Sequence, residues 1–395
     1  MTAKREVAIG AASAPFFVGI DLGGTSIKVS VFDNDGRRIS GTEVSELTKT
    51  WEGPEAGAQR IADTALHSIK QAGLKPEQIC RIGLASPGTM DIPAGKLVDP
   101  ANLPGWIRFP IRDRVAGHCG IPVTFANDAT AAAYAEYWTG AGCVDRARRT
   151  GDAATHPYSM ILLTLGTGIG CGLILNDQPF DGTHSHGGEY GHSIIDYSEN
   201  ARVCGCGKPG HFEAYASATA VAKRAYEALV AGQESSVADR ILSLPEVQEF
   251  LEHHRKENPR LERPAFLFRE LRRHEPFYGP IPKIVCEEAE KGDALSLALI
   301  DRTAMYLGVG TVNLMHTIDP DAIFFGGAML FGGPGTKLGE RFLDRIRQEI
   351  RCRAYPFLAE RTTIGFAAFG GDAGQYGAAG IARHEWLQRE SGATR

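Results

Sequence analysis

The stretch FVGIDLGGTSIKVSVF, residues 17–32, predicts two strands joined by a glycine turn. Phe17 to Asp21 is an apolar run typical of a strand, and Ile27 to Phe32 alternates as a second strand. Gly23, Gly24 and Thr25 connect the two strands. Because glycine lacks a Cβ, such a turn presents backbone N–H groups and a hydroxyl in a concave arc that suits phosphate oxygens.

The same pattern recurs in MILLTLGTGIGCGLIL, residues 160–175. Met160 to Leu165 predicts a strand, Gly166-Thr167-Gly168 a second glycine arc, and Gly170 to Leu175 the returning strand. A single turn of this kind is usually an ordinary hairpin, and neither matches the P-loop or dinucleotide fingerprint. Two of them at corresponding places in two halves favour a duplicated unit that clasps a polyphosphate between two domains.

Composition is that of a soluble globular protein. The 395 residues predict two or three domains. A hydrophobic share of 43% and a charged share of 23% provide for a large core. The net charge of −5 gives no electrostatic footprint for nucleic acid, and no run of about 20 apolar residues is present to cross a membrane. We therefore expect no nucleic-acid or membrane partner.

Cysteine usage indicates a reducing compartment. The eight cysteines are scattered without a disulfide framework, and the Cys204-Gly-Cys206 pair is typical of metal binding. We expect a cytoplasmic protein. Residues 1–15 have too short an apolar stretch for a signal peptide and are expected to form a disordered leader.

Residues 187–213 carry nitrogen and sulfur donors of the kind that a tetrahedral zinc ion prefers. These donors are His192, Cys204, Cys206 and His211. Their spacing is not that of a zinc finger, and a chain with its own core does not need metal to fold. The metal is therefore expected to order a local loop. The alternative is a pair of free thiols in a glycine-rich turn beside a core histidine.

Two carboxylates, Glu189 and Glu213, lie within three residues of the proposed ligands His192 and His211. Metal-ordered carboxylates indicate a pocket for a polar substrate. His184 and His186 are competing donors that we interpret as loop residues.

A third candidate site follows the predicted strand Val123 to Phe125. Asn127 and Asp128 end this strand, and residues 130–138 predict a strong helix. Either residue could simply be an N-cap. A carboxylate at the carboxyl end of a strand in an α/β sheet is also where catalytic acids and bases lie, so one residue could cap while the other reacts.

The remaining features are loops and one excursion. Residues 85–89 and 102–106 are turn-rich loops able to wrap a small polar ligand, and the predicted strand 322–325 ends at Gly326 and Gly327, where a nucleoside could approach closely. Residues 232–282 predict a solvated helical excursion without an assigned function.

Taken in order, these motifs resemble those of the ROK family of sugar kinases and repressors, in its glucokinase-like, zinc-containing branch. The resemblance covers most of residues 16–383. It rests on DLGGTSIK (21–28), LGTGIG (165–170), GGEYGH (187–192), CGCGKPGHFE (204–213) and FGG (325–327).

The resemblance implies an α/β architecture of the actin-like ATPase, ribonuclease H-like type, with two α/β domains around a central cleft. The expected divisions are an N-terminal domain at 16–140, a C-terminal domain at 141–383, and a terminal helix or tail at 384–395 that packs on the N-terminal domain.

It also implies roles for individual residues. Asp128 corresponds to the catalytic base. The sugar-binding residues would be Gly88, Asn102, Asn127, Asp128, Glu189, His192 and Glu213. The nucleotide and its Mg²⁺ would be held at Asp21, Gly23, Gly24, Thr25, Lys28, Gly166, Thr167, Gly168, Gly326 and Gly327. A structural Zn²⁺ would be held by His192, Cys204, Cys206 and His211, the last standing where the family usually has a third cysteine.

The implied activity is ATP-dependent phosphorylation of the 6-hydroxyl of glucose by a cytoplasmic homo-oligomer. Acceptors such as N-acetylmannosamine, fructose, mannose or allose remain alternatives, as does polyphosphate as the donor. A sugar-responsive repressor is the alternative from another class. It would need an N-terminal helix-turn-helix module, and 15 residues precede the first predicted strand.

Overall fold

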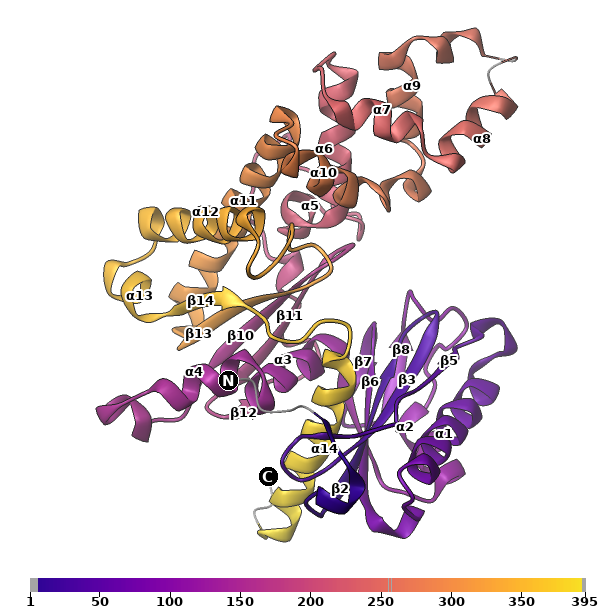
Figure 1. The fold of residues 1–395 in the computed structure, drawn as a ribbon, viewed down its shortest axis with the longest axis vertical. Coiled ribbons are helices and arrows are strands. Elements are labelled where there is room, and N and C mark those ends of the chain that lie inside the picture. Colours follow the sequence, from indigo (N-terminus) through magenta and orange to yellow (C-terminus); the bar gives the residue numbers. More distant parts are fainter. Residues whose placement is uncertain (1–5, 255, 257, 393–395) are drawn as a thin grey trace. The chain divides into compact units, whose positions relative to one another are not determined.

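The computed structural model describes residues 6–254, 256 and 258–392, and it forms two compact units (Figure 1). The first unit comprises Met1–Leu162, Cys171–Gly188 and Ala367–Arg395, and the second comprises Leu163–Gly170 and Glu189–Phe366. The boundary expected between residues 140 and 141 therefore falls inside the first unit. The chain passes between the units four times: within β10 (Met160–Leu165), within β11 (Ile169–Leu175), after Gly188 and after Phe366.

The first unit is built on a seven-stranded sheet in the order β1-β4-β3-β2-β6-β9, with β5 also paired to β3. Its strands are β1 (Glu6–Val7), β2 (Phe16–Leu22), β3 (Ser26–Phe32), β4 (Arg38–Ile39), β5 (Val44–Leu47), β6 (Ile79–Ser86) and β9 (Val123–Asn127). Strands β2 and β3 pair antiparallel, whereas β2, β6 and β9 are parallel. The predicted strand pair around the first glycine arc is therefore present.

Alternate residues of β2 serve two cores because side chains on a strand point to opposite faces. Val18 and Ile20 belong to a core that includes residues of α1 (Pro54–Gln71) and α2 (Ile111–Cys119). Phe17 belongs to a second core with residues of α3 (Asp128–Thr139) and α14 (Ala373–Glu390). The C-terminal helix thus packs on the first unit, and it begins at residue 373 rather than near 384.

Ordered structure begins before residue 16. Glu6 and Val7 pair in parallel with Arg38 and Ile39, so this part of the expected leader adds a strand to the sheet. The leader's first five residues lie outside the described part of the chain. Smaller elements of the first unit are β7 (Thr89–Asp91), β8 (Lys96–Asp99) and α4 (Ala141–Arg148).

The second large sheet has the order β12-β11-β10-β13-β14 and carries the second glycine arc between β10 and β11. Its other strands are β12 (Gln178–Pro179), β13 (Ala322–Gly327) and β14 (Thr363–Phe366). The helices of the second unit include α5 (Glu213–Ala216), α6 (Ala218–Val230), α10 (Ile281–Glu290), α11 (Ala294–Ile318), α12 (Lys337–Arg353) and α13 (Pro356–Arg361).

The excursion consists of short helices, as predicted, and forms the salmon-coloured part of Figure 1. They are α7 (Ser236–Leu242), α8 (Pro245–His254) and α9 (Pro264–Leu271). Leu267, Phe268 and Leu271 give α9 a buried apolar side, and the Tyr226 hydroxyl of α6 donates to the Phe277 carbonyl at 3.2 Å. The excursion is thus docked on the second unit by its apolar side.

Two further observations concern the cysteines and the helices. All eight cysteines are free thiols, in agreement with the absence of a disulfide framework. Among the described residues, we find no helix whose length and apolar character would let it span a membrane.

Candidate functional site

The first glycine arc is closed by its own backbone and by a neighbouring loop. The Gly23 N–H donates to the Ser26 carbonyl at 2.8 Å, and the Thr48 hydroxyl donates to the Gly23 carbonyl at 2.7 Å. A Cβ on Gly24 would lie 2.6 Å from the Asn102 carbonyl oxygen. The fold therefore places the predicted sugar residue Asn102 directly against the predicted phosphate arc.

Asp21 and Lys28 are cross-strand partners on either side of this arc. Lys28 Nζ donates to the Gly371 carbonyl at 3.3 Å, and a Cβ on Gly374 would lie 2.5 Å from the Asp21 carboxyl carbon. Burial raises the pKa of Asp21, Lys28 lowers it, and the nearby Asp372 carboxylate raises it further. Two acidic groups and one lysine thus gather beside the arc.

The start of α14 is a part of this site that sequence reasoning missed. Gly371, Asp372 and Gly374 contact or electrostatically influence Asp21 and Lys28 although they lie about 350 positions away in the chain. The run GGDAG at 370–374 was a usable signal, because clustered glycines mark close backbone approach.

At the end of β9, one residue caps the next helix and the following residue presents an exposed carboxylate. The Asn127 side chain accepts from the N–H groups of Ala129 at 2.9 Å and Thr130 at 3.4 Å, so Asn127 is the N-cap of α3. Asp128 is the first residue of that helix and is exposed, with one oxygen accepting from Ala129 at 2.8 Å. Asn127 lies beside Ser86 at the carboxyl ends of β9 and β6.

Gly88 occupies a turn that other residues fit poorly. Its φ is +91°, and a Cβ there would lie 2.7 Å from Pro100 Cα. Pro100 precedes Asn102 by two positions, so the two predicted loops of the sugar site pack against each other.

The second glycine arc is supported by α6. The Gly166 N–H donates to the Gly168 carbonyl at 3.1 Å, while the first turn of α6 donates to the arc through Ala218 N at 2.9 Å and the Thr219 hydroxyl at 2.8 Å. Gly327, with φ of +92°, packs closely against the Leu165 backbone. The fold therefore brings the Gly326-Gly327 turn to the second arc.

Glu213 connects this arc to the cysteine loop. One carboxylate oxygen accepts from the Ile169 N–H at 3.4 Å, and the other accepts from the Cys204 thiol at 2.8 Å. The side chain is 20% exposed, so the carboxylate is held in place while still reachable.

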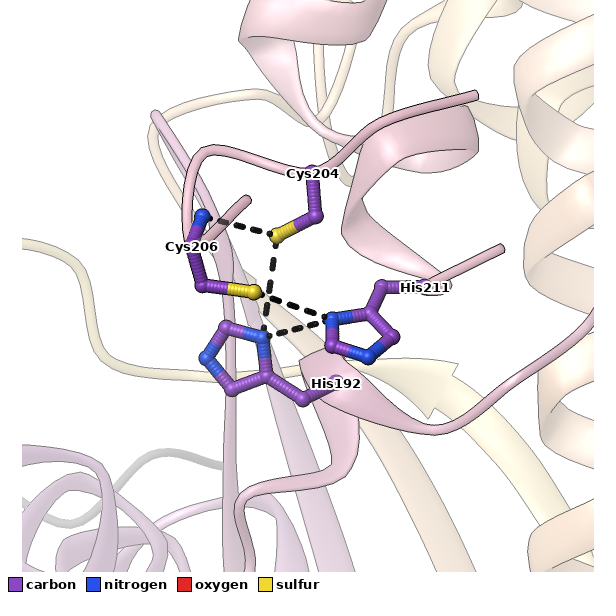
Figure 2. A group of neighbouring side chains, drawn as sticks. All are labelled: His192, Cys204, Cys206 and His211. Carbon is purple, nitrogen blue, oxygen red and sulfur yellow. Dashed lines mark hydrogen bonds between the residues drawn. The ribbon is translucent and has the colours of Figure 1, made fainter. Parts of the chain in front are cut away.

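The four predicted metal ligands converge on one point (Figure 2). One donor atom from each of His192, Cys204, Cys206 and His211 lies within 4.8 Å of all the others. The two Nδ1 atoms are 3.2 Å apart, Cys206 Sγ is 3.3 Å from His211 Nδ1, and Cys204 Sγ is 3.7 Å from His192 Nδ1. Tetrahedral zinc requires roughly 3.3 Å between two nitrogens and roughly 3.6 Å between nitrogen and sulfur. The donor set fits zinc.

The other nitrogen of His192 is directed to Glu189. Nε2 lies 3.8 Å from the Glu189 carboxylate, whereas Nδ1 faces the cysteines. Burial and then the Glu213 carboxylate raise the pKa of the Cys204 thiol, so a bound metal has to displace its proton. His184 and His186 are not members of the cluster.

Comparison with known proteins identifies the family. The sequence model of the ROK family matches residues 17–385. This chain belongs to the ROK family. It is 29% identical over 378 residues to a glucokinase from Halalkalibacterium halodurans, covering 95% of this chain and 98% of the relative. It is also 26% identical to a xylose repressor from Caldicellulosiruptor bescii, covering 86% and 70% of the two chains.

Solved structures agree with the ROK assignment. The ROK hexokinase of Thermus thermophilus is 28% identical with a TM-score of 0.68, covering 94% of this chain and 99% of that one. A ROK glucokinase from Streptomyces griseus, in complex with glucose and AMPPNP, is 27% identical with a TM-score of 0.64 and coverage of 93% and 99%. The fold is the actin-like ATPase fold, as expected.

In this ROK protein the predicted residues fall into two sets, one in each unit. The first unit holds Asp21, Gly23, Gly24, Thr25, Lys28, Gly88, Asn102, Asn127 and Asp128. The second unit holds Gly166, Thr167, Gly168, Glu189, His192, Cys204, Cys206, His211, Glu213, Gly326 and Gly327. Within each set, the residues of the glycine arc contact residues of the same unit's other motifs.

Proposed function

We propose that this protein is a glucokinase that transfers the γ-phosphoryl group of ATP to the 6-hydroxyl of glucose. The observation that carries the proposal is the end of β9, where Asn127 caps α3 and Asp128 presents an exposed carboxylate. Similarity to two glucokinases, one of which binds glucose and AMPPNP, supports the choice of sugar and nucleotide.

Asp128 acts as the general base. Phosphoryl transfer mainly requires an aligned acceptor, neutralised charge and a proton acceptor near the attacking hydroxyl. As the sugar oxygen attacks phosphorus, Asp128 accepts the hydroxyl proton. The ring hydroxyls would be held by the residues expected from the sequence, which are Gly88, Asn102, Asn127, Glu189, His192 and Glu213.

The two glycine arcs hold the nucleotide phosphates through backbone N–H groups. Mg²⁺, when bound with ATP, supplies charge neutralisation, and Asp21 is the residue that would hold it. The acidic pair Asp21 and Asp372 beside Lys28 fits that role. The turn at Gly326 and Gly327 packs on the second arc and would admit the adenosine.

The zinc ligands have a structural role in this proposal. Bound zinc would fix His192 through Nδ1, so that Nε2 and the adjacent Glu189 meet sugar hydroxyls in a preset orientation. We further propose that the protein is cytoplasmic and that it forms a homo-oligomer. Sedimentation of the purified protein would test the oligomer.

A coupled assay of phosphorylation over a hexose panel tests the function. Glucose, mannose, fructose, allose and N-acetylmannosamine are each supplied with MgATP or with polyphosphate. We expect the highest kcat/KM with glucose and ATP. A higher value for another sugar would overturn the glucose assignment, and absence of turnover with every pair would overturn the kinase assignment.

A further inference from the structure

A cavity of about 850 Å³ lies within the first unit, and none of the predicted site residues lines it. Its walls are β9, the second half of α14, the loop at 179–185 and the Ile92-Pro93 turn. A second cavity of about 570 Å³ shares Pro179, Asp181, Gly182 and Gln388 with it. The volumes are those of small-molecule sites with room for more than one ring.

We propose that this cavity is a second sugar-binding site that takes a neutral mono- or oligosaccharide. The charged side chains of its wall are two carboxylates, Asp181 and Glu385, and two guanidinium groups, Arg112 and Arg389. Glu385 accepts from the Thr124 hydroxyl, lies 3.6 Å from Arg81 and pairs with Arg389 at 2.6 Å. A phosphate would have to displace these pairs and would also face the Asp181 carboxylate, so it gains little here.

Arg112, the other cation of the wall, is compensated in the same way. It donates to the Pro93 carbonyl at 3.0 Å and to Asp113 at 2.8 Å. The wall therefore offers no cluster of uncompensated charge of the kind that anion sites use.

Ser185 and Gln388 add neutral hydrogen-bonding groups to the wall. The Ser185 hydroxyl accepts from Ile92 N–H at 2.9 Å, and the Gln388 carboxamide lies 2.9 Å from His384 Nε2. β9 is the last strand of its sheet, so N–H and C=O groups of alternate residues point away from β6 along this wall.

Apolar side chains complete the wall. The lining includes the apolar residues Ile92, Val123, Phe125, Pro179 and Ile381. A pyranose matches such a surface because it has apolar C–H faces and a rim of hydroxyls that both donate and accept.

The position of the cavity predicts an effect on catalysis. Val123 to Ala126 line it, and the same strand ends at Asn127 and Asp128. The loop at 179–185 continues directly into Gly187 and Gly188. A sugar that contacts both walls would restrict the segments that carry the catalytic base and lead to Glu189. We expect a coupling of roughly fivefold in affinity for the catalytic sugar, at the low end of allosteric effects.

Counting bound sugar tests the proposal on the intact protein. Equilibrium dialysis with labelled glucose should give two molecules per chain for the wild type and one for Gln388→Trp, which fills the cavity. Glu390→Trp, on the exposed part of the same helix and outside the cavity wall, is the matched control and should keep two. Glu189→Ala, in the catalytic set, should retain the cavity site alone.

Two further measurements test the role of the Gln388 amide and the class of ligand. Gln388→Leu preserves size but removes the amide, and should weaken the cavity site about tenfold. One glucose per chain in the wild type that Gln388→Trp retains, or two in Gln388→Trp, would overturn the proposal. One glucose in the wild type that Gln388→Trp loses would instead keep the cavity site and overturn the catalytic glucose site. Tighter binding of glucose 6-phosphate than of glucose, lost in Gln388→Trp, would overturn the neutral-ligand class. These counts do not depend on turnover, so loss of the kinase assignment leaves them interpretable.

Discussion

The two glycine arcs share one local design but receive their charge from different sources. The first arc has Asp21 and Lys28 on its own strands, backed by the start of α14. The strands of the second arc, residues 160–175, contain no charged residue, and its carboxylate comes from Glu213, which the Cys204 thiol contacts. The first arc therefore carries charge on its own strands, whereas the second takes its carboxylate from the segment that holds the proposed zinc ligands.

The largest expected effect concerns Asp128, in the unit of the first arc. Asp128→Asn should lower kcat by about 10²–10⁴-fold because an amide cannot accept the hydroxyl proton. Sugar affinity and the melting temperature should change little. Steady-state kinetics, sugar titration and thermal unfolding measure the three quantities.

Asn127→Ala is the matched variant at the neighbouring position. Loss of the N-cap should cost about 1 kcal/mol of stability. A fall in kcat of less than tenfold for Asp128→Asn would make Asp128 a structural residue and not the base.

The second prediction tests whether the proposed zinc ligands support the sugar site of the second unit. We expect one zinc per chain by elemental analysis, and Cys206→Ser should weaken zinc binding and raise the KM for glucose by about 10–100-fold. Cys352→Ser, an exposed thiol on α12, is the control and should change neither quantity. Metal-replete protein without zinc, or an unchanged KM in Cys206→Ser, contradicts the structural role.

The third prediction tests the Asp21 carboxylate, which lies beside the first arc. Burial raises the pKa of Asp21, so activity that needs the ionised carboxylate should fall on acidification at a higher pH than an ordinary aspartate allows. Because the native state holds this proton more tightly than the unfolded state, Asp21 should stabilise the protein at low pH. That contribution is lost as the pH rises through the raised pKa.

Asp21→Asn should therefore reduce kcat/KM for ATP by roughly tenfold or more. The fall in kcat/KM at acidic pH that comes from protonation of Asp21 should also disappear in this variant. Profiles of kcat/KM and of unfolding free energy against pH measure both effects. An unchanged acid limb in the variant would show that another group titrates there.

The smallest expected effects are those of alanine substitutions at the glycines of the two arcs. A Cβ at Gly24 would lie 2.6 Å from the Asn102 carbonyl, whereas a Cβ at Gly166 would have no neighbour within 4 Å. Gly24→Ala should cost about 1–3 kcal/mol of stability. Gly166→Ala should change stability by less than about 0.5 kcal/mol.

Gly166→Ala should nevertheless raise the KM for ATP, since its methyl group occupies the open space over the arc. Denaturant unfolding and ATP kinetics separate the two quantities. Equal stability losses in both variants would contradict the difference in packing.

Much of the candidate site could be predicted from the sequence because its signals lie within short stretches of the chain. Strand periodicity around 17–32 and 160–175 marked both arcs, and the composition of 187–213 indicated the metal ligands that the structure brings within 4.8 Å. The choice between Asn127 and Asp128 as cap stayed open. Both side chains are good caps, and only the side-chain geometry at the helix start distinguishes them.

The family, the two arcs, the cluster of two histidines and two cysteines and the end of β9 could all be predicted from the sequence. These features depend on residue type and on spacing between near neighbours. Tertiary structure alone decided that Gly371 and Gly374 meet Lys28 and Asp21, and that Asn102 packs on Gly24. It alone decided that a cavity opens beside β9. The physical reason is that packing between distant segments depends on the shapes of whole elements, which no local pattern encodes.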